Sequence, residues 1–82
     1  MTMNKVAIYS TPTCHFCHMA KDFFNEQGIE FQEFDVSSDL SKRKEMVDKS
    51  GQMGVPVIII DDTNIIVGFN KSKIIELLGI KE

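Results

Sequence analysis

The sequence predicts one α/β domain over residues 1–82, with a four-stranded mixed sheet and three helices. Short apolar runs at residues 6–9 and 55–60 are typical of strands buried on both faces. Elsewhere apolar residues recur at helical spacing, and glycines stand where helices would end. The predicted order is strand, helix, strand, helix, strand, strand, helix. The first two strands therefore need a parallel crossover, and the last two form an antiparallel hairpin.

The N-terminal half is expected to form a strand, a helix and a second strand. Residues 6–9 form the first strand, and turn-forming residues 10–13 end it. The first helix is expected to run to about Gln27, where Gly28 suits a left-handed ending. Residues 29–36 follow as a strand, and the polar pair Gln32 and Glu33 indicates that it lies at the sheet edge.

The C-terminal half is expected to begin with a surface helix over residues 40–50. Ser37, Ser38 and Asp39 are its candidate N-caps, and residues 51–54 form a loop after it. Residues 55–60 are apolar enough for a central strand, which residues 61–64 turn into a strand at residues 65–67. A short helix then ends at Gly79.

The composition restricts the class of partner. A net charge of −3 argues against nucleic acid, and the cationic run at residues 42–44 is interpreted as the solvated face of a helix. No apolar run approaches the ~20 residues that a membrane-spanning helix needs. No export signal is visible at the start of the sequence. We therefore expect a cytoplasmic monomer without a membrane partner.

Cys14 and Cys17 lie where the first strand gives way to the helical pattern, so both fall on the first turn of a helix. A Cys-x-x-Cys pair beside a strand-helix-strand pattern is typical of a thiol redox centre. Two cysteines this close cannot hold a fold together as a secreted disulfide framework does, so their role is chemical.

The helix geometry predicts different roles for the two thiols. The attacking group in thiol–disulfide exchange is a thiolate, and a helix N-terminus favours an anion at Cys14. Cys17 lies one turn deeper, on a stripe with Ala20 and Phe24, so we expect it to be partly buried with a higher pKa. Cys14 is then the nucleophile, and Cys17 resolves the mixed disulfide by attacking the sulfur of Cys14.

Thr13, His15 and Phe16 form the predicted surroundings of the thiolate. A protonated ring of His15 or His18 would stabilise the anion, and the alternative is two histidines that simply face solvent. Phe16 is expected to pack in the core rather than to recognise a substrate.

The segment at residues 9–17 (YSTPTCHFC), with the order and length of the elements, resembles the glutaredoxins, the smallest members of the thioredoxin fold. The resemblance covers essentially the whole chain, including Val55 and Pro56. It implies a thioredoxin-like fold, a thiol–disulfide oxidoreductase activity and a cis peptide bond before Pro56, beside the thiolate. It implies no bound cofactor, glutathione as a co-substrate, and disulfide-containing proteins as substrates.

Three departures from the family pattern bear on the reaction. His15 and Phe16 stand where glutaredoxins often carry Pro and Tyr, and Thr11 stands where many carry Lys. Gly68-Phe69 replaces a Gly-Gly pair and is similar to the glutaredoxin-like electron donors of ribonucleotide reductase, which thioredoxin reductase serves. The electron source is therefore either glutathione or thioredoxin reductase. Phe69 either occludes glutathione or packs under the last helix.

If glutathione binds, the resemblance implies Val55 as its main-chain partner. Asn70 and Lys71 at the start of the last helix would take a carboxylate. The other candidate binding residues are Thr11, Met53, Pro56, Gly68 and Phe69.

Residues 14–18 also match Cys-x-x-Cys-His, the attachment signature of c-type haem, through Cys14, Cys17 and His18. The missing export signal and the strand ahead of the motif argue against a haem carrier. A closed zinc site would need a second ligand pair, which the sequence lacks, so we predict no metal ligand. An iron–sulfur cluster shared between two subunits, as some glutaredoxins hold, and a non-enzymatic binding module remain alternatives.

Overall fold

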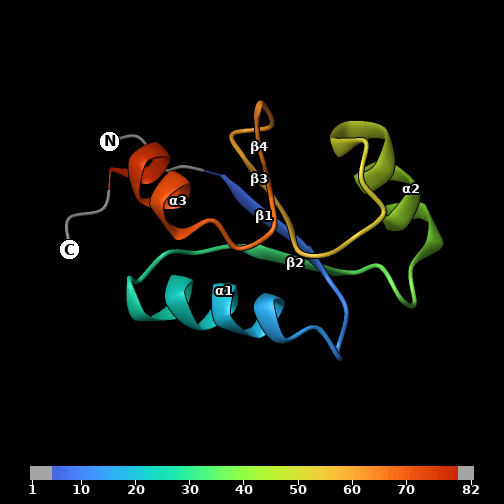
Figure 1. Cartoon of the computed structure of the whole chain (residues 1–82), viewed down its shortest axis with the longest axis horizontal. Helices are drawn as coiled ribbons and strands as arrows, with labels where there is room; N and C mark the ends of the chain where they lie inside the picture. The colour runs from blue at the N-terminus through green and yellow to red at the C-terminus, as the bar shows by residue number, and fades with distance from the viewer. Residues whose placement is uncertain (1–4, 80–82) are drawn as a thin grey trace.

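The computed structural model describes residues 5–79, which form a four-stranded sheet and three helices (Figure 1). The elements in chain order are β1 (Val6–Ser10), α1 (His15–Glu26), β2 (Gln32–Asp35), α2 (Leu40–Ser50), β3 (Val57–Ile60), β4 (Asn64–Val67) and α3 (Lys71–Leu78). The strand order is β2-β1-β3-β4, with β1 parallel to β2 and β3 antiparallel to both of its neighbours. The predicted α/β class and mixed sheet are confirmed.

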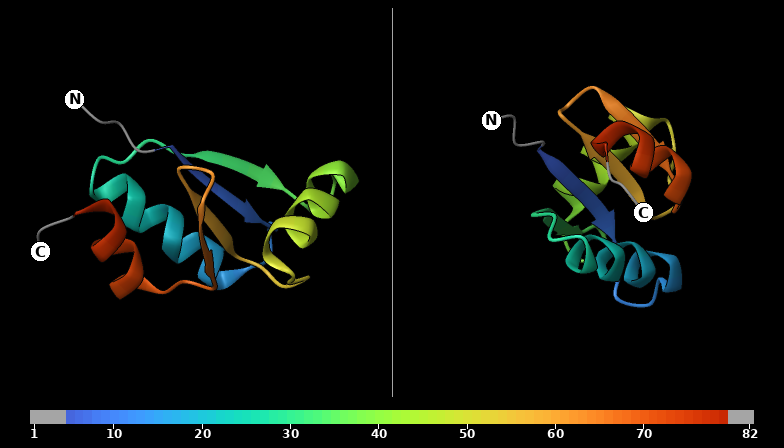
Figure 2. Two further views of the ribbon diagram at one scale, coloured as in Figure 1. Left: turned by 90° about the horizontal axis from the view of Figure 1, so that it is seen from above. Right: turned by 90° about the vertical axis from the view of Figure 1, so that its left-hand side faces the viewer.

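The alternation of side chains along β1 and β3 gives the sheet two apolar faces. Ile8 and Ile58 lie on the face that packs against α1 and α3, whereas Tyr9 and Val57 lie on the face that packs against Met46 of α2. Figure 2 shows α1 and α3 close together and α2 at the far end of the sheet. The two apolar clusters fix the end of β1 and the start of α1, where the cysteines lie.

Two strands are shorter than the sequence predicts. The second was expected over residues 29–36, but Ile29 donates its N–H to the carbonyl of Phe24 (2.8 Å) and so closes α1 instead of opening β2. The third was expected over residues 55–60, but it begins at Val57 because Pro56 has no N–H to give to a ladder. β2 lies at the sheet edge and β3 in its interior, as predicted.

Side chains and glycines set the helix ends. Asp39 is the N-cap of α2, where its Oδ1 accepts from the N–H of Lys42 (3.1 Å), and Gly51 ends that helix at φ 71°. Asn70 is the N-cap of α3, where its Oδ1 accepts from the N–H of Lys73 (3.2 Å). Within residues 5–79, no helix has the length and apolar character needed to cross a membrane.

Candidate active site

Cys14 is the N-cap of α1, with extended backbone angles of φ −83° and ψ 111°. Its Sγ accepts a hydrogen bond from the N–H of Cys17 (3.2 Å), one of the donors that a helix start leaves without a partner. Its own N–H donates to the carbonyl of Thr11 (3.2 Å), which closes the turn between β1 and the helix. Cys14 is half-buried and both cysteines are free thiols, so this sulfur sits at the positive end of α1 within reach of a substrate.

Cys17 occupies a different environment one turn further along α1. It is 0% exposed, so its burial is complete rather than partial as expected. Burial first, and the side chain of Cys14 second, raise the pKa of Cys17 to about 12, while the backbone of Thr11 and the charge of Lys21 act in the opposite direction. The neutral thiol is therefore the resting form of Cys17.

The histidines beside the pair are exposed and make local contacts. The Nε2 atom of His18 lies 2.8 Å from the carbonyl oxygen of Pro12, within the turn that precedes α1. The ring of His15 meets Phe16 edge-on, with centroids 5.8 Å apart. Thr13 is an exposed turn residue immediately before Cys14.

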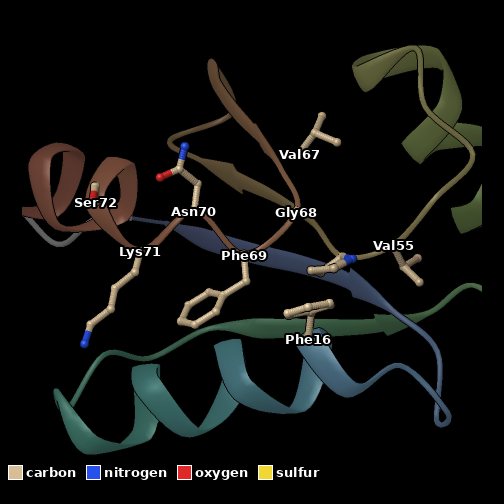
Figure 3. Close-up of a pocket in the computed structure, with 9 residues that line it drawn as sticks. Phe16, Val55, Val67, Gly68, Phe69, Asn70, Lys71 and Ser72 are labelled. Carbon is tan, nitrogen blue, oxygen red and sulfur yellow. The ribbon is translucent and has the colours of Figure 1, made fainter.

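A groove of about 500 Å³ lies beside the start of α1 and gathers most of the predicted binding residues (Figure 3). Phe16 was expected to pack in the core, but it is 58% exposed and forms the α1 side of this groove. Its ring lies next to that of Phe69, which descends from the β4–α3 connection (Figure 3). The groove is lined by Phe16, Val55, Pro56, Val67, Gly68, Phe69, Asn70, Lys71 and Ser72.

The bond between Val55 and Pro56 is cis, as the resemblance implied, and Pro56 is a buried residue of the groove lining. The N–H of Gly68 donates to the carbonyl of Pro56 (2.8 Å) and joins the two loops that frame the groove. Gly68 has φ +80°, a left-handed conformation that favours glycine.

Phe69 packs against the core and also lines the groove. Its ring lies 6.0 Å from that of Phe23 on α1, which bears out packing, one of the two alternatives for this residue. Lys71 places its Nζ 5.2 Å from the centroid of the same Phe23 ring. The aromatic ring and the ammonium group thus anchor the start of α3 to α1.

Two predicted residues lie outside the groove lining. Met53 is exposed in the loop after α2. Thr11 acts through its backbone: its carbonyl accepts the N–H of Cys14, and a backbone hydrogen bond from Thr11 favours the ionised form of Cys17. Sequence reasoning missed Val67 and Ser72 as lining residues and Lys21 as a neighbour of Cys17. Among residues 5–79, no group of three or more His, Cys, Asp or Glu side chains could hold a metal ion.

Comparisons with known proteins agree with this geometry. The family model described as glutaredoxin matches residues 6–65. The chain is 48% identical over 73 residues to a glutaredoxin-like 8.6 kDa protein in the rubredoxin operon of Clostridium pasteurianum, covering 89% of this chain and 96% of that protein. It is 41% identical over 63 residues to glutaredoxin 3 of Escherichia coli K12, covering 77% and 76%.

The crystal structure of a glutaredoxin from Archaeoglobus fulgidus superposes with a TM-score of 0.82 at 25% identity, covering 93% of this chain and 87% of that one. The chain belongs to the glutaredoxin family and has its thioredoxin-like fold. Membership supports thiol–disulfide oxidoreductase chemistry in general, as the sequence predicted.

Proposed function

We propose that this protein reduces protein or glutathione mixed disulfides in the cytoplasm, with Cys14 as the nucleophile and Cys17 as the resolving thiol. The observation that supports these roles is the contrast between the two sulfurs. Cys14 is half-buried and accepts the N–H of Cys17, whereas Cys17 is fully buried. A sulfur that receives an amide at a helix start is favoured as an anion, and a buried one is not.

The reaction proceeds in two exchanges. The Cys14 thiolate attacks a substrate disulfide R–S–S–R′, forms a Cys14–S–R bond and releases R′S⁻, which takes up a proton from water. Cys17 then loses its proton and attacks the sulfur of Cys14. The bond between the two cysteine sulfurs forms as the bond between Cys14 and the substrate sulfur breaks. The substrate leaves as RS⁻ with the electron pair of that bond and takes up the proton that Cys17 lost. The substrate gains two electrons, and the protein ends as an internal disulfide.

We propose glutathione as the reductant that restores the dithiol. The groove at the start of α1 has the volume for a short peptide, about 500 Å³, with Val55 on one side and the start of α3 on the other. Asn70 and Lys71 at the start of α3 suit a carboxylate there, because the positive end of a helix and the Lys71 cation both favour an anion.

A second candidate reductant is thioredoxin reductase, and one observation favours it. The ring of Phe69 lines the groove at the position where a glycine would leave backbone free for a tripeptide. With Phe16 opposite, the groove then presents two aromatic rings, which suit a protein surface.

Two recycling systems distinguish the reductants. Reduction of a small mixed disulfide is measured with glutathione plus glutathione reductase, and separately with thioredoxin reductase, each with NADPH consumption as the readout. We expect turnover in the glutathione system to be faster. Faster turnover with thioredoxin reductase would contradict the glutathione proposal and leave the thiol chemistry intact.

Matched cysteine variants test the two roles. Cys14→Ser is expected to abolish all activity, because no competent attacking sulfur remains. Cys17→Ser is expected to keep reactions that need a single thiol, such as deglutathionylation, and to lose reduction of protein disulfides. Both variants are assayed on a glutathionylated peptide and on a protein disulfide. Equal residual activity in the two variants would refute the role assignment.

A further inference from the structure

Lys21 lies one helical turn beyond Cys17, so the two side chains project from the same side of α1. Most residues at polar positions of this helix are exposed, but the Lys21 side chain is only 18% exposed. Its Nζ lies 2.5 Å from Oε2 of Glu33 on the edge strand β2. The ammonium group is thus held against the sheet rather than extended into solvent.

Glu33 is itself held from the end of β1. It stands opposite Ile8 in the parallel register, so it shares the α1 face of the sheet with Ile8 and Ser10. The hydroxyl of Ser10, a residue that is 1% exposed, donates to the same Oε2 atom (3.1 Å). A hydroxyl, a carboxylate and an ammonium group therefore form a connected chain under α1.

We propose that Lys21 is a positioning residue for the resolving step: held by Glu33 and Ser10, its charge stabilises the Cys17 thiolate as that thiolate forms. This inference rests on the proposed function, because it concerns the second exchange of that reaction. The first exchange, in which Cys14 attacks, does not require it.

The resolving step needs such a charge because Cys17 is buried without access to water. The proton must leave Cys17 before its sulfur can attack Cys14, and the released RS⁻ carries that proton away as RSH. The backbone of Thr11 and the cation of Lys21 favour this ionisation, and Cys14, which opposes it in the free dithiol, carries no charge once it is bonded to the substrate sulfur. Ser10 on β1 is neutral, and Glu33 on β2 partly offsets the charge of Lys21.

An ion pair that merely ties β2 to α1 would also explain the contact, and variants of the two partners separate the explanations. In the structural case, Lys21→Met and Glu33→Gln both weaken the tether and act in the same direction. In the electrostatic case they act oppositely on Cys17. Losing Lys21 removes the favourable charge, and losing Glu33 frees that charge from its counter-ion.

The experiment mixes the reduced full-length protein with the chromogenic disulfide 5,5′-dithiobis(2-nitrobenzoate) and follows release of its thiolate by stopped flow. The first phase reports attack by Cys14, and the second reports resolution by Cys17. For Lys21→Met we expect the rate ratio of second to first phase to fall about three- to tenfold near neutral pH. Its pH profile shifts upward by about half a unit to one unit, since one unit is tenfold in thiolate. Lys21→Arg is expected to restore the ratio, and Glu33→Gln to shift the profile downward.

Lys42→Met is the matched control, because Lys42 also pairs with a glutamate (Glu45) but on the opposite face of the sheet. It is expected to leave both phases unchanged. Thermal unfolding of each variant checks the fold, and Lys21→Gln replaces Lys21→Met if the latter does not fold. A Lys21 profile superimposable on the wild type, or parallel shifts in the Lys21 and Glu33 variants, would overturn the proposal. A missing first phase in the wild type would instead refute the proposed function.

Discussion

Cys17 is predicted to resist alkylation in the folded protein although it lies three residues from a reactive cysteine. The perturbation that isolates it is Cys14→Ser, which leaves Cys17 as the one thiol in this chain of two cysteines. Burial, the largest cause of the raised pKa of Cys17, does not depend on Cys14 and persists in this variant.

The size of the effect follows from the thiolate fraction. An unfolded cysteine with an ordinary pKa of ~8.5 is about 3% thiolate near pH 7. A thiol whose pKa is raised to about 12 is only ~0.001% thiolate at the same pH. Alkylation proceeds through the thiolate, and Cys14→Ser removes the part of the pKa shift that the Cys14 side chain causes, so the folded variant should react roughly a hundred times more slowly than the unfolded one. Complete burial adds to this protection, since the reagent must also reach the sulfur.

The assay treats the Cys14→Ser variant with iodoacetamide, with and without concentrated guanidinium chloride, and counts adducts by mass spectrometry over time. Cys17→Ser is the matched control, and its remaining thiol, the half-buried Cys14, should be labelled readily in the folded state. Comparable labelling rates of Cys17 in the folded and unfolded protein would refute the argument that burial holds its proton. Slow labelling of Cys17 through local opening of the fold is compatible with the argument, and such labelling should slow further when the fold is stabilised.

Two further predictions concern α2 and the groove. The pKa of the Glu45 carboxyl is lowered from 4.5 to about 2 by hydrogen bonds from Lys42, the largest cause, then Lys49, then Tyr9. The ionised carboxylate therefore stabilises the folded protein above about pH 4.5, and this stabilisation is lost as the pH falls toward 2. Glu45→Gln is expected to lower the free energy of unfolding by about 1 kcal/mol near pH 7, after allowance for solvent screening, and by less near pH 3. Urea unfolding at the two pH values measures both losses, and equal losses would contradict the prediction. Phe16→Ala is expected to change the unfolding free energy by less than about 0.5 kcal/mol but to raise KM for a glutathionylated peptide roughly fivefold. An unchanged KM would exclude Phe16 from the binding surface.

The sequence predicted well those parts of the fold whose ends are marked by local signals, such as capping residues, glycines and breaks in the apolar pattern. The helix α2 was expected over residues 40–50 and spans Leu40–Ser50, because Asp39 caps its first turn and Gly51 takes a left-handed conformation after its last. The positions of Cys14 and Cys17 follow from a similar signal, since a broken apolar run and a helical pattern meet at Cys14. Such signals depend on neighbours in the chain, which the sequence displays directly.

The parts that it missed depend on distant segments. Helical spacing groups Phe16 with the apolar residues of α1, but the sheet covers only the stripe through Cys17 and Phe24, and Phe16 lies beyond it. Nothing in the sequence distinguishes Lys21 from a surface lysine, because its partner, Glu33, comes from the next strand. Only the parallel register of β1 and β2 brings that carboxylate under the helix.

The position of Cys14 at the N-cap also explains how the pair can close into a disulfide. Residues three apart on a helix have Cβ atoms about 5–6 Å apart, whereas a disulfide needs about 3.5–4.5 Å. Cys14 is the N-cap of α1, so the regular helical spacing does not hold its Cβ atom. Cys17 is fixed by complete burial within α1, whereas Cys14 has extended backbone angles and joins the helical ladder only through its carbonyl, which accepts the N–H of His18 (3.2 Å). Cys14, the less buried of the two, is thus both the sulfur that is proposed to meet the substrate and the one with more freedom to turn inward. We therefore expect oxidation to move the turn before α1 rather than the helix and its core.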